Sequence, residues 1–237
     1  MTNHRAFFNR PLTYSVAVLL LGILLTISAS THTVSSLFLI PGNQVLEDLR
    51  TGKNLTDDQI DTLIASRKRS LQFFESGQKW TDIGLAFLLL EARTHDSEEK
   101  KAILTKAITS LEKGLSLAPS NPWGWTRLAH AYILLEGPSE KAAEALVRAI
   151  LVAPYEPSIL LTRLTLVLSA WEYLPKNAWP LAFAQVRTVW RSTPDDLTKL
   201  ALNSHRLHIV RSALLEAPEN LKKFEILVQK TLAAGKH

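Results

Sequence analysis

The sequence predicts an all-α protein in which a single N-terminal transmembrane helix is followed by an α-solenoid of helix pairs. Nineteen residues from Leu12 to Ser30 pass without a charged side chain. Further along, apolar and small residues recur at helical spacing, and prolines at 119, 154 and 194 follow three such runs. Because proline cannot continue an α-helix, each of these positions marks a turn between consecutive helices.

Composition narrows the possible functions. The chain has 237 residues, 46% of them apolar and 21% charged, which is typical of a folded domain. It contains no cysteine, which excludes disulfides, thiolate metal sites and a cysteine nucleophile. The formal charge of +5 is spread along the chain, so we expect no nucleic-acid partner.

Residues 12–30 have the length of a membrane span. At a rise of about 1.5 Å per residue their helix is roughly 28 Å long, close to the hydrocarbon thickness of a bilayer. Arg5 and Arg10 precede the span, and no Lys or Arg follows it until Arg50. The positive-inside rule therefore predicts a single-pass protein of a bacterial inner membrane, with residues 1–11 in the cytoplasm and the bulk of the chain in the periplasm. A signal peptide cleaved after small residues at the end of this segment is the alternative.

The segment after the span is predicted to be a linker, residues 31–55, that leads to a first soluble helix, residues 56–77. The linker includes the apolar run 37–42, "LFLIPG", which is too short to span a membrane. Thr56 and Gln59 have the spacing of a capping box at the start of the helix. A glycine is predicted to end that helix.

The leading helix carries a short basic run, Arg67, Lys68 and Arg69. Such a run is most often a solvated helix face, and on that interpretation Arg67→Ala is nearly neutral. Contact with anionic lipid headgroups is the alternative.

A pattern of small and apolar residues recurs three times within residues 78–194. In the second helix of each unit the positions are Ala107, Leu111, Gly114 and Pro119, then Ala142, Leu146, Ala149 and Pro154, then Ala182, Val186, Val189 and Pro194. In the first helix they are Trp80, Ile83, Gly84 and Phe87, then Trp125, Leu128, Ala129 and Tyr132, then Leu160, Arg163, Leu164 and Val167. The small residues would let two antiparallel helices approach closely while the large ones fill the space beside them.

This pattern resembles the tetratricopeptide repeat, W-x2-L-G-x2-Y followed by A-x3-F and a terminal proline. The resemblance implies about three stacked helix-turn-helix units, and it is closest in the unit of Trp125. The third unit lacks the tryptophan and the glycine. The first has eleven residues more than the pattern between Trp80 and Ala107, which longer helices would absorb.

Residues 195–237 are predicted to form capping helices, one starting near Asp195 and a terminal one after Pro218. The apolar run 158–171 is interpreted as a buried repeat helix rather than a second membrane span, because it is short and contains Arg163.

No catalytic motif is evident in the sequence, so we expect neither an enzyme nor a cofactor. His205 and His208 are spaced to share a helical face, but no further ligand completes a metal site. What remains is the concave surface that the resemblance implies, lined by the first helix of each unit.

The predicted groove is lined by apolar and neutral residues, which suits an amphipathic partner helix. Its residues are Leu85 and Leu88 in the first unit, Trp123, Thr126, Arg127, His130 and Ile133 in the second, and Leu161, Thr165 and Leu168 in the third. Occupation of the groove by the protein's own terminal helix is the alternative.

These features together predict a membrane-anchored periplasmic scaffold that binds a partner protein in a bacterial envelope assembly or export complex. Membrane lipid is the second expected partner, through the N-terminal helix. Small anchored repeat proteins of this kind resemble accessory subunits of polysaccharide export, secretion, pilus and cytochrome maturation systems, and the sequence does not choose among these. The alternative is a module that binds a glycan or another envelope ligand by stacking on Trp123 and Trp125.

Overall fold

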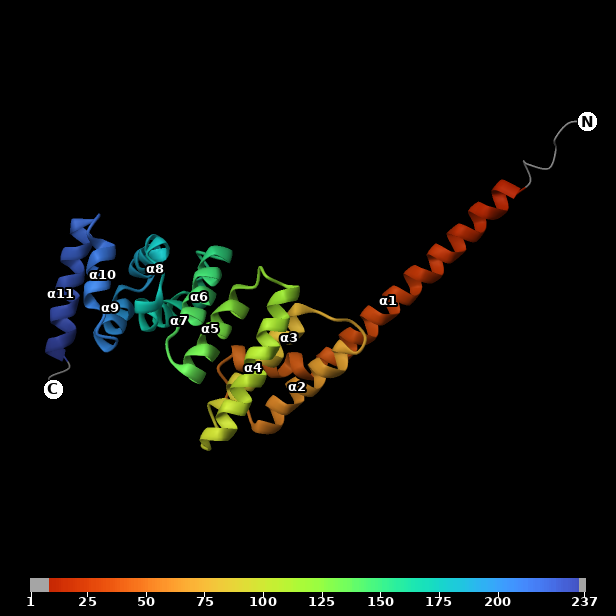
Figure 1. Ribbon diagram of the computed structural model, residues 1–237, viewed down its shortest axis with the longest axis horizontal. Coiled ribbons are helices and arrows are strands. Elements are labelled where there is room, and N and C mark those ends of the chain that lie inside the picture. Colours follow the sequence, from red (N-terminus) through yellow and green to blue (C-terminus); the bar gives the residue numbers. More distant parts are fainter. Residues whose placement is uncertain (1–8, 235–237) are drawn as a thin grey trace, which may run out of the picture.

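The computed structural model describes residues 9–234, and within this range every regular element is a helix (Figure 1). The α-helices are α1 (Asn9–Arg50), α2 (Asp57–Leu71), α3 (Gly77–Glu91), α4 (Ser97–Leu117), α5 (Pro122–Glu136), α6 (Glu140–Val152), α7 (Pro157–Ser169), α8 (Trp179–Ser192), α9 (Pro194–Asn203), α10 (Leu207–Leu214) and α11 (Pro218–Ala234). Two short 3-10 turns, η1 (Trp171–Tyr173) and η2 (Lys176–Ala178), connect α7 to α8.

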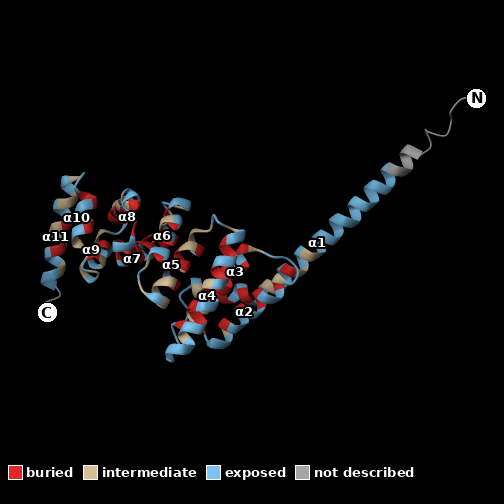
Figure 2. Ribbon diagram, viewed as in Figure 1, coloured by how far each residue is buried: buried red, intermediate tan, exposed pale blue. Residues whose placement is uncertain are grey.

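Helix α1 is a single rod of 42 residues whose N-terminal half projects away from the rest of the protein (Figure 1). Its side chains from Tyr14 to Ser30 are exposed, and the helix is long and apolar enough to cross a membrane (Figure 2). The helix continues through Pro41 to Arg50. The prediction of a linker at 31–55 is therefore wrong for most of its length.

The "PG" dipeptide that suggested a linker is instead a contact between α1 and α2. A Cβ at Gly42 would lie 2.1 Å from the hydroxyl of Ser66 and 2.7 Å from a guanidinium nitrogen of Arg67. Only a residue without a side chain lets α2 lie this close to α1. Val45, one turn further along α1, is buried in the same contact.

Helix α2 begins as predicted and ends earlier than predicted. The backbone N–H of Gln59 donates to the Thr56 hydroxyl at 3.3 Å, and the Gln59 side-chain oxygen accepts from the Thr56 N–H at 2.8 Å, which confirms the capping box. The last residue of the helix is Leu71. Gly77 opens α3 instead, where an added Cβ would lie 2.5 Å from the carbonyl oxygen of Gly114.

Arg67 is buried, so its interpretation as part of a solvated face is wrong. Its Nε donates to Asp82 at 2.9 Å, and its other nitrogens donate to the Leu39 carbonyl, to Asn43 and to the Ser66 hydroxyl. The guanidinium thereby joins α1, α2 and α3. The two neighbouring basic side chains of the run remain exposed.

The helices after α2 lie side by side in an elongated array, in which most contacts join helices that are near each other in the sequence (Figure 1). Two groups of buried apolar side chains hold the array together. The smaller lies among α1, α2 and α3, and the larger extends from α3 and α4 to α11. Phe87 on α3 packs against both.

Residues of the recurring pattern lie in this core. Ala107, Leu111, Ala142 and Leu146 are fully buried. An added Cβ at Gly84 would come within 2.5 Å of the Leu111 side chain, so α3 and α4 are in close contact there. The additional residues of the first unit mainly lengthen α4, which has 21 residues against 13 in α6.

Arg163 on α7 is the largest fully buried side chain among the described residues. Its nitrogens donate to the carbonyl oxygens of Ala149 and Ala153 at 2.9 Å each, to the Pro154 carbonyl at 3.3 Å, and twice to the side-chain oxygen of Gln185. All five guanidinium donors are used. The cation thus caps the C-terminus of α6, where the helix dipole favours positive charge.

The C-terminal region has one helix more than predicted. The segment predicted as a single helix after Asp195 is divided into α9 and α10. His205 adopts a left-handed conformation with a φ of 57°, and the Arg206 N–H donates to the Ala201 carbonyl at 2.9 Å, which ends α9. Helix α11 is held by Phe224, which is fully buried and meets the Trp190 ring edge-on at 6.0 Å.

Candidate functional site

The structure distributes the predicted groove residues between surface and core. Trp123, His130, Leu161 and Thr165 are exposed; Leu85, Arg127 and Ile133 are half-buried; Leu88, Thr126 and Leu168 are buried. The buried members pack within the array, and the Thr126 hydroxyl donates to the Pro122 carbonyl at 2.8 Å. The surface that remains open is therefore a narrower row than the sequence suggested.

Within this row, Trp123 is 37% exposed and packs against the guanidinium of Arg127, which lies 5.5 Å from the ring centroid. Burial lowers the pKa of Arg127, and the charge of Asp82 partly opposes that shift. Desolvation also lowers the pKa of His130, against the opposing charge of Glu91. Charged and aromatic groups therefore lie next to each other along α5.

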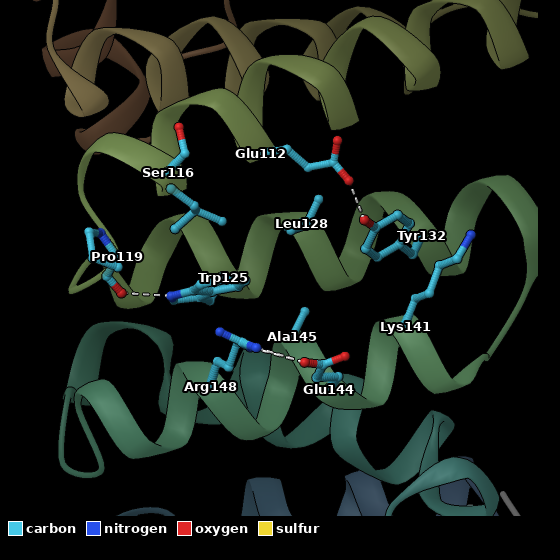
Figure 3. A pocket seen from close by; sticks show the side chains of 11 residues that line it. Glu112, Ser116, Pro119, Trp125, Leu128, Tyr132, Lys141, Glu144, Ala145 and Arg148 are labelled. Carbon is cyan, nitrogen blue, oxygen red and sulfur yellow. Dashed lines mark hydrogen bonds and ion pairs between the residues drawn. The ribbon is translucent and has the colours of Figure 1, made fainter.

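A cavity of about 480 Å³ lies away from this row, between α4, α5 and α6 (Figure 3). It is lined by Glu112, Leu115, Ser116 and Pro119 from the α4 side, by Trp125, Leu128 and Tyr132 from α5, and by Lys141, Glu144, Ala145 and Arg148 from α6. We call it the α4–α6 cavity. Its volume lies within the range of pockets that bind small ligands or the side chains of a partner.

The two aromatic residues of the α4–α6 cavity are held in place by hydrogen bonds (Figure 3). The indole N–H of Trp125 donates to the Pro119 carbonyl at 2.8 Å. The Tyr132 hydroxyl donates to Glu112 at 2.6 Å. Burial raises the pKa of Tyr132, and the hydrogen bond to the Glu112 carboxylate raises it further, so the phenol stays protonated.

A cation covers one face of each ring. The guanidinium of Arg148 lies 5.1 Å from the ring centroid of Trp125, and the ammonium of Lys141 lies 5.9 Å from that of Tyr132. Arg148 also pairs with Glu144 at 2.8 Å. With Glu112 included, the rim carries two positive and two negative side chains, so it can meet both charges of a partner surface.

A second hollow adjoins the first across α6. It measures about 390 Å³ and is lined by Glu140, Glu144, Val147, Tyr173 and Pro175. Because Glu144 lines both, the two hollows form one uneven surface over α6. This surface offers aromatic side chains, hydrogen-bond donors and acceptors for binding.

Comparisons with known proteins add no identity to this geometry. The chain matches no protein-family model and no curated protein.

Metal-binding groups do not gather in the part of the chain that the structure describes: no cluster of three or more His, Asp or Glu side chains is found there. His205 lies in the turn between α9 and α10, and His208 is on α10, and both are exposed.

The sequence interpretation assigned Trp125 to the repeat core and so missed the α4–α6 cavity. In the structure the ring is half-buried, with one part in the core and one part at the cavity. A signal was present in the spacing of Lys141, Glu144 and Arg148, which are three and four residues apart and therefore share one helix face. Together with Tyr132, seven residues after Trp125, they indicate an outward face shared by two helices.

Proposed function

We propose that this protein is a membrane-anchored scaffold that binds a partner protein in a bacterial envelope assembly or export complex. Its helices are those of a solenoid related to tetratricopeptide repeats, the bulk of the chain lies in the periplasm, and the α4–α6 cavity is the main contact with the partner. The observation that carries the proposal is this cavity, with two hydrogen-bonded aromatic rings inside a rim of balanced charge.

Aromatic and arginine side chains in a partly enclosed site are the residues that supply most of the binding energy in protein interfaces. Trp125, Tyr132 and Arg148 are of this kind, and the first two are already fixed by hydrogen bonds to Pro119 and Glu112. A site with fixed side chains loses little conformational entropy when a partner binds. The balanced rim favours a partner with charges of both signs over a polyanion.

The packing of the array supports the repeat interpretation. Gly84 and Ala129 occupy equivalent positions of the pattern and both are buried, and Gly84 lies where α3 meets α4. Arg163 occupies the position before the corresponding residue of the third unit, with its own set of buried partners. The third unit therefore keeps the helix pair while departing from the sequence pattern.

A second candidate function is glycan binding by stacking on exposed tryptophans. Trp123 is the residue that favours it, because 37% of its surface is exposed. Against it, one face of Trp123 is covered by Arg127, and one face of Trp125 is covered by Arg148. Sugar stacking requires an open ring face, so partner-protein binding is the better use of these side chains.

The proposal is tested by comparing the proteins that co-purify with variants of the full chain in mild detergent. The pair Glu144 and Arg148 is exchanged as Glu144→Arg with Arg148→Glu, which keeps the ion pair and reverses the charges at the cavity. The matched control exchanges Arg211 and Glu225, an exposed pair at 2.7 Å on α10 and α11. We expect the cavity exchange to abolish co-purification and the control to leave it intact.

A third variant, Trp123→Ala with Ile133→Asp, examines the predicted groove. Loss of the partner in this variant alone would move the binding site to the groove. A different result would replace the scaffold proposal by the glycan one. In that result every variant still co-purifies with the same proteins, and the protein binds a peptidoglycan or chitin resin only when Trp123 is present.

A further inference from the structure

Exposed apolar side chains gather where α1 enters the rest of the protein. Leu37 and Ile40 on α1 are 60% and 61% exposed, and Phe73 and Phe74, which follow α2, are both 42% exposed. The Phe38 ring stacks on the Phe73 ring, with centroids 5.4 Å apart. We call these five residues the collar.

The collar is fixed to the rod of α1. Helices α1 and α2 are antiparallel, because Ser35 bonds to Ser70 at 2.8 Å while Asp48 accepts from Gln59 at 3.4 Å. The C-terminal end of α2 therefore lies nearest the exposed half of α1. The Phe74 ring lies 4.0 Å from the ring of His32, just beyond the apolar run.

A buried lysine holds the loop that carries the two phenylalanines. Lys79 Nζ donates to the Phe74 carbonyl and to the Ser35 hydroxyl, at 2.6 Å each, and lies 5.1 Å from the centre of the Phe74 ring. The loop after α2 is thereby tied to α1. The exposed rings of this loop therefore stay at a fixed position along the axis of α1.

We propose that the collar is a second membrane contact, inserted into the interfacial layer of the bilayer that α1 spans. This inference rests on the proposed membrane anchoring. The occupant is the lipid headgroup region on the side of the membrane that faces α2 to α11.

Helix geometry places the Phe74 end of the collar within the headgroup layer, whereas Ile40, nine residues beyond Thr31, lies about 14 Å past the hydrocarbon core. A hydrocarbon core of about 30 Å uses about 20 residues of helix, so a span that starts at Leu12 ends near Thr31. The headgroup layer adds about 5–7 Å on each side, or about four more residues. Phe74 lies level with His32, and side chains on a helix lean toward its N-terminus, so the Phe38 ring points back toward the span.

The opposite end of the α1–α2 pair exposes polar and charged side chains. The turn between α1 and α2 exposes Thr51, Lys53, Asn54 and Asp57. Exposed aromatic rings are found at the collar end of this pair and not at this turn. Phenylalanine and leucine are among the side chains that interfacial segments bury at the boundary between headgroups and acyl chains, so the asymmetry favours a lipid surface at the collar.

The basic residues beside the collar fit the same surface. Lys68 and Arg69, in the last turn of α2, are exposed. They lie about one helical turn farther from the span than Phe73, or roughly 5 Å. That height suits contact with phosphate groups, while the rings lie deeper.

Depth measurements on single cysteines test the proposal, and the natural chain has no cysteine to interfere. The full chain is reconstituted in vesicles of phosphatidylethanolamine and phosphatidylglycerol, with an environment-sensitive fluorophore at one of three positions. These are Leu21 in the span, Gln72 beside the collar, and Asn54 at the opposite end of α2. Nitroxides on the lipid headgroup or on the acyl chain serve as quenchers.

We expect acyl-chain quenching at Leu21, headgroup quenching at Gln72, and neither at Asn54, which lies beyond the far end of α2, more than about 21 Å away by the rise of that helix. If Leu21 is quenched but Gln72 is as free of quenching as Asn54, the collar proposal is overturned and the anchor remains. Leu21 free of quenching would reject the anchor, and the collar proposal with it. Gln72 shielded from an aqueous reductant without lipid quenching would indicate a second copy of the chain and would also overturn it.

A variant then assigns the contact to the rings. Phe73→Ser with Phe74→Ser should remove headgroup quenching at Gln72 while quenching at Leu21 and the far-ultraviolet circular dichroism stay unchanged. Persistent quenching at Gln72 in a folded variant would show that these rings do not hold the domain on the membrane, and would reject this role for the collar.

Discussion

The buried ion pair of Arg67 and Asp82 gives the sharpest test of the packing between α1, α2 and α3. Both side chains are nearly inaccessible, with 3% and 7% exposed, and their charged atoms lie 2.9 Å apart. Arg67→Met keeps the length and apolar stem of the side chain and removes the charge. Asp82 then keeps the hydrogen bond from Gln78 at 2.7 Å and the weaker attraction to the charge of Arg127.

Removing one partner of a buried pair leaves the other charge in a medium of low polarity, which costs about 3–5 kcal/mol. The substitution also removes the bonds from Arg67 to the Leu39 carbonyl and to Asn43, both on α1. We therefore expect the free energy of unfolding to fall by about 3–5 kcal/mol. The double variant Arg67→Met with Asp82→Leu removes both charges and should recover most of this loss.

The assay is urea unfolding of the full chain in a non-ionic detergent, followed by circular dichroism. Arg211→Met is the matched control, since its ion pair with Glu225 is exposed and such pairs contribute about 0–1 kcal/mol. An equal, small effect of Arg67→Met and Arg211→Met would refute the assignment of a buried, structural ion pair.

Four other outcomes follow from separate parts of the structure. Gly84→Leu should lower the melting temperature, because an added Cβ would lie 2.5 Å from Leu111 and overpacking costs about 1–3 kcal/mol or more. The control Gly22→Leu should leave the melting temperature unchanged, because a Cβ there has nothing within 4 Å. Equal melting temperatures for the two variants would contradict the close approach of α3 and α4. Arg163→Lys should destabilise the protein by at least about 1–3 kcal/mol, because an ammonium has three donors where the guanidinium uses five, and full stability of this variant in denaturant would argue against the cap on α6. Because desolvation lowers the pKa of His130, a nuclear magnetic resonance titration should place that pKa below 6.5. The stability that depends on neutral His130 is present above pH 6.5 and is lost as the pH falls through the folded-state pKa. If His130→Gln loses stability at acid pH as the natural protein does, His130 is excluded as the source of that loss. A reporter active only outside the cytoplasm, fused after His237, should be active, and the protein should stay with the membrane after an alkaline wash; release into the soluble fraction would reject the anchor.

Local signals were read correctly because the atoms involved lie within a few residues of each other. The capping box of Thr56 and Gln59 joins residues three apart. Such bonds depend little on the rest of the fold, so the sequence alone determines them.

Tertiary contacts explain the main errors. Pro41 and Gly42 have the composition of a turn, yet α1 continues through them because α2 packs against this part of the helix. Arg67 lies in a basic run of typical surface composition, but its partner Asp82 is on another helix. Neither contact has a signature within the local sequence.

The candidate site could be predicted only in part from the sequence, because it too depends on tertiary contacts. A repeat pattern assigns Trp125 to the core, and part of the ring does lie there. The α4–α6 cavity depends on the distance between α4 and α6, which is set by the packing of α5 between them. Helical spacing indicates which residues share a face, but not whether a neighbouring helix leaves that face open.

The unbroken course of α1 from the apolar segment into the packed helices makes the chain sensitive to register. In a flexible tether, one residue more or less changes only the reach. In this helix, one residue inserted between Thr31 and Ser35 would turn everything that follows by about 100° about the helix axis and advance it by about 1.5 Å. Seven inserted residues would bring the direction back to within about 20° of the original. A partner that is itself held in the membrane would meet a surface of fixed direction and height. Its binding would therefore vary periodically with the number of inserted residues, with the period of the helix, and would not simply weaken as the chain becomes longer.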